Sequence, residues 1–141
     1  MNVLVDTPVW SLALRRKPRD LHPREQALTR ALAELIREGR AQMMGAIRQE
    51  LLSGIREEDR FRRLRESLRA FEDPALHTED YEMAAQMNNA CRRRGVACSP
   101  IDLLICAVAS RRNWLILTAD RDFDHYQRVL GITLFEAGTG S

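Results

Sequence analysis

Four acidic residues stand out because each adjoins an apolar segment. Asp6 directly follows the run VLV, and Asp120 comes three residues after the run LIL. Asp102 precedes seven consecutive apolar residues, and Glu50 shares the apolar helix face of GAIRQELLSG. Carboxylates gathered in one place bind hard divalent cations, which activate water for hydrolysis. Such chemistry therefore requires a fold that brings the four acids together.

Ordinary structural roles also explain three of these acids individually. Asp6 would complement the dipole of a helix for which Thr7 is the N-cap. Asp120 precedes another helix, and Asp102 stands three residues after a serine, which is the spacing of a capping box. Glu50 has no such role, because it lies inside its helix on the face that should pack inward. For the other three acids both interpretations remain open.

Strand and helix patterns alternate along the chain without an internal repeat or a linker. Short apolar runs predict strands at residues 2–5, 41–44, 75–78, 114–117 and 132–135. Apolar residues at helical spacing predict helices at residues 9–14, 24–37, 47–54, 57–71, 79–94, 99–112 and 122–130. We therefore expect an α/β fold, a three-layer α/β/α sandwich around a mostly parallel sheet of about five strands. One domain should cover residues 1–136, with a flexible C-terminal tail at residues 137–141.

The composition excludes several classes of protein. Among 141 residues, 45% are hydrophobic and 30% are charged, as in globular proteins. No apolar run approaches the roughly 18 residues that span a bilayer, and no export signal is evident, so we expect a cytoplasmic protein with no membrane partner. The three cysteines lack CxxC spacing, which argues against a disulfide framework or a zinc site. Lys17 is the only lysine, which excludes mechanisms that need a lysine later in the chain.

The predicted sheet brings the acids to one place. The carboxyl ends of parallel strands meet at one edge, where ligands bind, so Asp6 and Asp120 should project from the same edge. A buried carboxylate without a partner costs several kcal/mol, and either an arginine or a cation must compensate for it. Four acids outnumber the arginines that the pattern places beside them. This favours Mg²⁺ or Mn²⁺ bound by carboxylate oxygens.

Four segments occur in a specific order over nearly the whole chain: VLVDTPVW, RQELLSG, RRRGVACSPIDLLICAVA and LILTADRDFD. In their order, spacing and total length the sequence resembles PIN-domain ribonucleases, specifically the VapC toxins of VapBC toxin–antitoxin systems. The resemblance implies a PIN-like sandwich and matches Asp6, Glu50, Asp102 and Asp120 to the family's acidic quartet. It implies that Asp6 and Asp102 hold the principal Mg²⁺ or Mn²⁺ ion. Glu50 and Asp120 would then contribute to a second ion or orient water.

The resemblance also assigns residues beside the quartet. Thr7 and Thr118 match the family's small hydroxyl positions, and Thr7 with nearby backbone amides would bind phosphate at a helix start. Asp122 and Asp124 lie close to Asp120 and would substitute for it or assist it. The implied substrate is RNA, hydrolysed to leave a 5′-phosphate and a 3′-hydroxyl. The sequence does not distinguish transfer, ribosomal and messenger RNA as the target.

Partners are implied in the same way. The resemblance implies a homodimer and a cognate VapB-type antitoxin whose C-terminal segment covers the acidic cleft. The helices at residues 24–37 and 57–71 are candidate docking surfaces, although their apolar stripes could equally pack inside the domain. Several arginines are candidates for contacts with the RNA backbone, which would make binding sensitive to salt, or are simply solvated helix ends. They are Arg92 to Arg94, Arg111, Arg112 and Arg121.

Two other functional classes fit part of this pattern: aspartate-dependent phosphotransfer proteins and non-catalytic binding modules. Haloacid-dehalogenase-type phosphatases and response-regulator receivers also place acids at strand ends and bind Mg²⁺. The phosphatases need a second aspartate two residues after the first, where this chain has Pro8, and both classes normally use a late lysine. The alternative is a catalytically silent PIN-like module that binds RNA or a protein. The presence of all four acids favours an enzyme, and an RNA cleavage assay discriminates the two.

Overall fold

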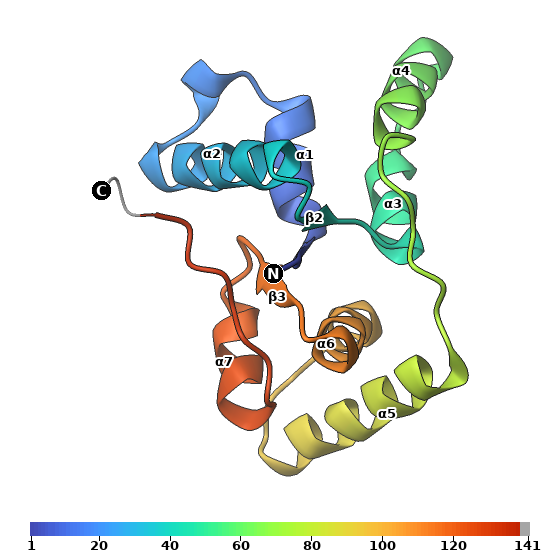
Figure 1. Cartoon of the computed structure of the whole chain (residues 1–141), viewed down its shortest axis with the longest axis vertical. Coiled ribbons are helices and arrows are strands. Elements are labelled where there is room, and N and C mark those ends of the chain that lie inside the picture. Colours follow the sequence, from blue (N-terminus) through green and yellow to red (C-terminus); the bar gives the residue numbers. More distant parts are fainter. Residues whose placement is uncertain (139–141) are drawn as a thin grey trace.

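A parallel sheet of three strands lies at the centre of the structure, a computed structural model that describes residues 1–138 (Figure 1). Its strands are β1 (Val3–Val5), β2 (Ala41–Gln42) and β3 (Leu115–Leu117), in the order β2-β1-β3. All three residues of β1 are fully buried. A strand covered by helices on both faces needs apolar side chains on both, which explains why VLV and LIL do not alternate with polar residues.

Seven α-helices surround the sheet in the described part of the chain. They are α1 (Thr7–Arg15), α2 (Pro23–Arg37), α3 (Gly45–Leu52), α4 (Glu58–Leu68), α5 (Thr78–Arg93), α6 (Pro100–Arg112) and α7 (Asp122–Val129), with a 3-10 turn at Pro18–Asp20. Helices α1 and α2 lie on one side of the sheet and α5, α6 and α7 on the other, while α3 and α4 form an arm beside it (Figure 1). The expected sandwich of helices around a parallel sheet is confirmed.

The sheet has fewer strands than expected. Residues 132–135 contribute a single parallel bridge, between Leu134 and Ile116, rather than a strand. Residues 75–77 are irregular and lead into α5, so the strand predicted at residues 75–78 is wrong. The carbonyl of Ala75 instead accepts a hydrogen bond from Arg112, which uses the backbone group that a strand would have paired. Of the predicted tail at residues 137–141, the last three residues lie outside the described chain.

Helix α6 is apolar on nearly every side because it lies between the sheet and α5. Residues 105–109 are all buried, and each has an exposed fraction of 1% or less. This position explains the long apolar run after Asp102. No helix in residues 1–138 has the length and apolar character needed to cross a bilayer.

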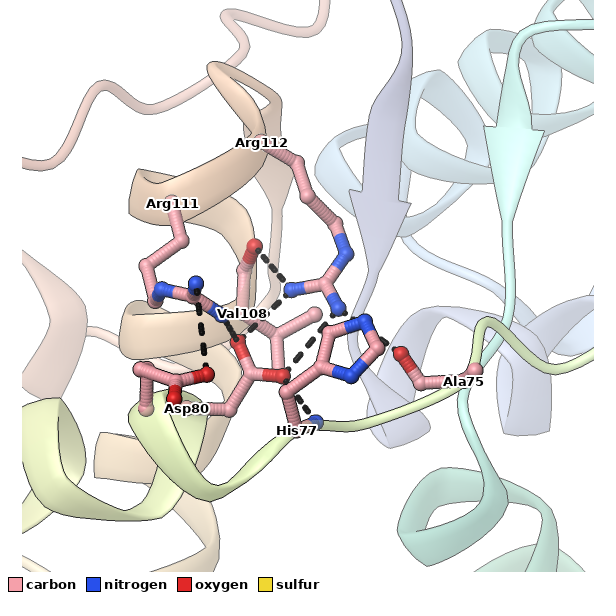
Figure 2. Close-up of polar contacts among 7 residues, drawn as sticks. Ala75, His77, Asp80, Val108, Arg111 and Arg112 are labelled. Atoms are coloured by element: carbon pink, nitrogen blue, oxygen red, sulfur yellow. Dashed lines mark hydrogen bonds and ion pairs between the residues drawn. The ribbon is translucent and has the colours of Figure 1, made fainter.

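A buried carboxylate joins α5 to the C-terminal end of α6 (Figure 2). Asp80 has no exposed surface, and its Oδ1 accepts hydrogen bonds of 2.8 Å from both Arg111 and Arg112. Its Oδ2 accepts from Arg112 at 3.1 Å and from the backbone of His77 at 2.8 Å. The Arg112 guanidinium is the main cause that holds the pKa of Asp80 well below its usual range, and the other donors contribute less. Arg111 and Arg112, considered above as RNA contacts, therefore bind an internal acid.

Breaking this ion cluster should destabilise the fold. We expect Asp80→Asn to lower the free energy of unfolding by about 3 kcal/mol, because two partly buried arginines lose their anionic partner. Urea unfolding at pH 7 measures this change. Asp59→Asn is the matched control, because Asp59 pairs with Arg62 on the exposed face of α4, and it should change stability by about 0.5 kcal/mol or less. Equal effects in the two variants would contradict the structural role of Asp80.

Candidate metal centre

The register of β1 and β3 brings two of the predicted residues together. Val5 pairs with Leu117, so the next residues, Asp6 and Thr118, leave the sheet at the same level. The Thr118 hydroxyl donates to Asp6 Oδ2 at 2.8 Å and accepts from the backbone N–H of Asp120 at 2.9 Å. One threonine therefore holds both strand-end aspartates, as expected for acids at the carboxyl edge of a parallel sheet.

The strand order explains why a crevice forms at this point. From β1 the chain first crosses to β2 on one side, and it later returns past β1 to β3 on the other. Ligands bind in open α/β sheets at such reversals, beyond the carboxyl ends of the strands. Asp6 is also the N-cap of α1, because its Oδ1 accepts the backbone N–H of Thr7 at 2.8 Å. The expectation that Thr7 is the N-cap is therefore wrong.

Glu50 reaches the same edge from α3, but it is exposed rather than packed inward. Ile47 and Leu51 form the buried stripe of this short helix, and Glu50 lies at its flank, about 100° of helix rotation before Leu51. The expected buried carboxylate is therefore wrong at this position. Glu50 Oε1 instead accepts a hydrogen bond of 2.7 Å from the Thr7 hydroxyl. This bond ties Glu50 to the residue that follows Asp6.

Two further carboxylates, Asp102 and Asp122, converge on Asp120. One oxygen from each of Asp102, Asp120 and Asp122 lies within 4.8 Å of the others. Asp102 and Asp120 are half-buried and Asp122 is exposed. The backbone N–H of Asp122 donates to Asp120 Oδ1 at 2.9 Å, which turns the start of α7 toward the cluster. The cluster thus includes Asp122, one of the two aspartates expected to substitute for Asp120 or assist it.

The electrostatics indicate an accumulation of negative charge. Burial raises the pKa of Asp6 to about 6, with a further contribution from the neighbouring Asp102 and Asp120 carboxylates. Burial and Asp120 likewise raise the pKa of Asp102. Within the described residues no arginine, lysine or histidine forms an ion pair with these acids or with Glu50 and Asp122. Asp80, by contrast, forms ion pairs with two arginines.

A hard divalent cation fits this donor set. Every side chain that converges here offers an oxygen, and Mg²⁺ and Mn²⁺ prefer oxygen ligands. Asp102, Asp120 and Asp122 approach one another closely enough to share an ion. Asp6 joins them through Thr118. Two like-charged buried acids cannot both ionise cheaply without a compensating charge, and a bound cation supplies one.

Tyr126 was missed by the sequence reasoning. Its hydroxyl donates to Asp102 Oδ2 at 2.9 Å, and its ring is buried beside that of Phe123. Burial and the adjacent carboxylate raise the pKa of the Tyr126 hydroxyl, which keeps it a neutral donor. The available signal was an aromatic residue with a polar end on the apolar face of a helix, because such a hydroxyl must find a partner when buried.

A cavity of about 690 Å³ adjoins the acids. It lies between α2, the start of α7 and residues 134–138, and Thr118 and Asp120 contribute to its wall. Arg24, Arg30 and Arg121 line it, and so does Asp124. Asp124 therefore faces this cavity rather than the cluster that Asp122 joins.

Comparison with known proteins agrees with this arrangement. Residues 3–129 match the model of the PIN domain family. The chain belongs to the PIN domain family. This match covers the strands that carry Asp6 and Asp120, the helices that carry Glu50 and Asp102, and α7. No curated protein matches the sequence.

Solved structures of toxin–antitoxin proteins share the fold of this PIN domain. FitAcB from Neisseria gonorrhoeae has a TM-score of 0.75 and 20% identity, over 96% of this chain and 97% of that one. VapBC2 from Rickettsia felis, bound to a DNA fragment from its promoter, has a TM-score of 0.72 and 16% identity, over 96% and 98%. DNA-bound VapBC from Salmonella typhimurium has a TM-score of 0.69 and 14% identity, over 96% and 97%. At these identities the likeness establishes the fold.

The raised pKa of Asp6 predicts how stability depends on pH in the absence of metal. A carboxyl whose pKa rises from 3.8 to about 6 on folding favours the fold fully below pH 3.8, and that contribution is lost as the pH rises through 6. At pH 7 in EDTA, Asp6→Asn should therefore be about 3 kcal/mol more stable than the parent protein. Near pH 4 the difference should disappear. Urea unfolding at the two pH values measures it, and a less stable variant at pH 7 would contradict the assignment.

Proposed function

We propose that this PIN domain is a metal-dependent endoribonuclease and the toxin of a type II toxin–antitoxin system. The observation that carries the proposal is the group of carboxylates at the carboxyl edge of the sheet, which lack a cationic partner among the described residues. The family match and the fold shared with FitAcB and VapBC2 support it. An RNA substrate implies action in the cytoplasm.

Each acid has a stated task in this proposal. Asp6, Asp102, Asp120 and Asp122 hold Mg²⁺ or Mn²⁺. A bound divalent cation lowers the pKa of water and neutralises the charge that develops on a phosphate. Thr118 keeps Asp6 and Asp120 in place through its two hydrogen bonds. Both donors of Thr7 already serve carboxylates, Asp6 through its N–H and Glu50 through its hydroxyl, so its task is to position these acids rather than phosphate.

The exposed Glu50 completes the reaction scheme. Its carboxylate lies at the solvent-facing rim and orients the attacking water by accepting a hydrogen bond from it. The water oxygen forms a bond to phosphorus as the water gives up a proton, the bond from phosphorus to the 3′ oxygen breaks, and the 3′ oxygen takes up one proton, so that one water is added in total. The products are a 5′-phosphate and a 3′-hydroxyl. In-line attack with charge compensation at the phosphate is the general requirement for this displacement.

A VapB-type antitoxin and a second copy of the chain are the proposed protein partners. The stripe of α2 that we considered for docking packs inside the domain, since Leu28, Leu32 and Leu35 are buried. The arm offers a better surface. Leu14 is 42% exposed, and it lines a groove with Ile55, the half-buried Leu64 and neighbouring residues of α4. A VapB-type helix with apolar side chains could cover such a groove.

RNA cleavage should depend on both the metal and the acids. The purified chain, freed of any antitoxin, should cleave RNA with Mg²⁺ or Mn²⁺ and lose activity in EDTA. Asp6→Asn or Asp102→Asn should reduce the rate about a hundredfold or more, because each removes charge at the phosphate-binding position. Gel analysis of a labelled RNA and mapping of its new ends measure both effects. Circular dichroism checks that the variants remain folded.

Asp59→Asn serves as the control, since this exposed acid lies on α4 and pairs with Arg62. It should cleave at the parental rate. Activity that survives EDTA, or parental rates in both site variants, would reject the mechanism. Binding of RNA without any cleavage would favour the catalytically silent module instead.

The arginines beside the acids should contribute to RNA binding. In the Asp6→Asn background, which permits binding without cleavage, Arg121→Gln should weaken single-stranded RNA binding and make it less sensitive to salt. Each lost phosphate contact lowers the slope of log K against log salt by about 0.7. Fluorescence anisotropy over a salt series measures the slope. Arg37→Gln is the control, because Arg37 is 72% exposed near the far end of α2 and does not line the cavity. An unchanged slope in Arg121→Gln would contradict the contact.

A further inference from the structure

A hydroxyl from a distant part of the chain holds the carboxylate of Asp102. Its carboxylate lies in the first turn of α6, where Oδ2 accepts the Tyr126 hydroxyl at 2.9 Å. The Ser99 side chain at the helix start also stabilises the charged form of this carboxylate, after the larger effect of the Tyr126 hydroxyl. A carboxylate held at one oxygen presents its second oxygen in a limited range of directions. A carboxylate that binds a metal ion needs its coordinating oxygen to point in a defined direction.

The hydroxyl of Tyr126 is itself held in place by packing. Its side chain is 1% exposed. Its ring meets the ring of Phe123 edge-on, with centroids 5.1 Å apart and an interplanar angle of 75°. Helix α7 also packs against α5. A close-packed side chain of this kind keeps one rotamer, so its hydroxyl stays at one position.

The placement of Tyr126 on α7 links it to the acids. Asp122 precedes it by four residues, which puts both side chains on the same face of the helix. Asp122 also contributes an oxygen to the cluster with Asp102 and Asp120. Helix α7 therefore supplies one carboxylate directly and reaches a second through a hydroxyl. Packing alone does not call for that hydroxyl, since Phe123 fills the adjacent part of the core without one.

We propose that Tyr126 is a positioning residue of the metal centre, and that its hydroxyl holds Asp102 in the orientation that binds a divalent cation. This rests on the proposed function, because it takes Asp102 to be a ligand. Removal of a hydrogen-bond partner of a metal ligand lowers metal affinity by about 10–100-fold in other sites. Tyr126→Phe removes only the hydroxyl and keeps the ring.

Mn²⁺ binding to the metal-free, full-length protein tests this without RNA. Isothermal titration at constant pH should give a dissociation constant about tenfold higher for Tyr126→Phe than for the parent. Tyr81→Phe is the matched control, because Tyr81 is 56% exposed on α5, and its dissociation constant should equal the parental one. Parental affinity in Tyr126→Phe would overturn the proposal.

A second variant separates the hydroxyl from the packing. Phe123→Leu removes the edge-on ring contact and retains the Tyr126 hydroxyl, so it should lower the melting temperature and weaken Mn²⁺ binding much less than Tyr126→Phe does. If Phe123→Leu weakens Mn²⁺ binding as much as Tyr126→Phe, packing is the cause and the proposal fails. In RNA cleavage, Tyr126→Phe should need about tenfold more Mn²⁺ for its half-maximal rate and recover the parental rate at saturation. A rate that stays low at saturating Mn²⁺ would also overturn it.

Asp102→Asn distinguishes this failure from failure of the proposed function. If Asp102→Asn binds Mn²⁺ as tightly as the parent, the metal centre itself is wrong, whatever Tyr126 does. If Asp102→Asn loses Mn²⁺ while Tyr126→Phe keeps it, only the role of Tyr126 is wrong. Loss in both variants, with Tyr81→Phe unchanged, supports both.

Discussion

The burial of several carboxylates at one edge of the sheet is the constraint on which the rest of this structure depends. Asp6, Asp102 and Asp120 are buried or half-buried, and the pKa of Asp6 is raised by burial and by the other two. Folding a chain with such a group is unfavourable unless other interactions compensate. The apolar strands, the fully packed α6 and the ion cluster at Asp80 supply that compensation at a distance from the acids.

Two buried aspartates show how differently one fold treats the same side chain. Asp80 accepts hydrogen bonds from two guanidinium groups, and its pKa is held far below its usual range. Among the residues that the structure describes, Asp6 accepts only from a backbone N–H and a hydroxyl, and its pKa is raised. The arginine-rich composition therefore does not neutralise acids indiscriminately. Asp80 lies near the end of α6 opposite Asp102, about 15 Å along the helix, so the two arginines anchor α6 without reaching the acidic edge.

The sequence predicted the parts of the site that follow from local patterns. Asp6 and Asp120 were found because parallel strands end at one edge, and Asp102 because it precedes a long apolar run. The sheet was overestimated, because short apolar runs at residues 75–78 and 132–135 look like strands, although only Leu134 pairs and only by one bridge. Glu50 was placed on an inward face because its helix is too short to separate a flank from a core stripe. The chemical roles of these acids stay predictions.

Contacts between residues far apart in the chain were not predictable in the same way. Tyr126 meets Asp102 across 24 residues, and Arg111 meets Asp80 across 31. Neither pair forms a local motif, because each requires α5, α6 and α7 to be packed first. A tyrosine or aspartate expected to be buried must have a hydrogen-bond partner, but the identity of that partner depends on tertiary structure.

The short connection from β3 to α7 has a consequence for how such a chain can vary. Four residues after Leu117 make contacts that depend on their separation along the backbone: Thr118, Asp120, Asp122 and Tyr126. One inserted or deleted residue there would turn every later side chain away from its neighbour. The arm of α3 and α4 has a constraint of its own, because Arg48 donates to the Leu68 carbonyl and pairs with Asp73. Length variation among natural relatives should accordingly spare the nine residues after β3.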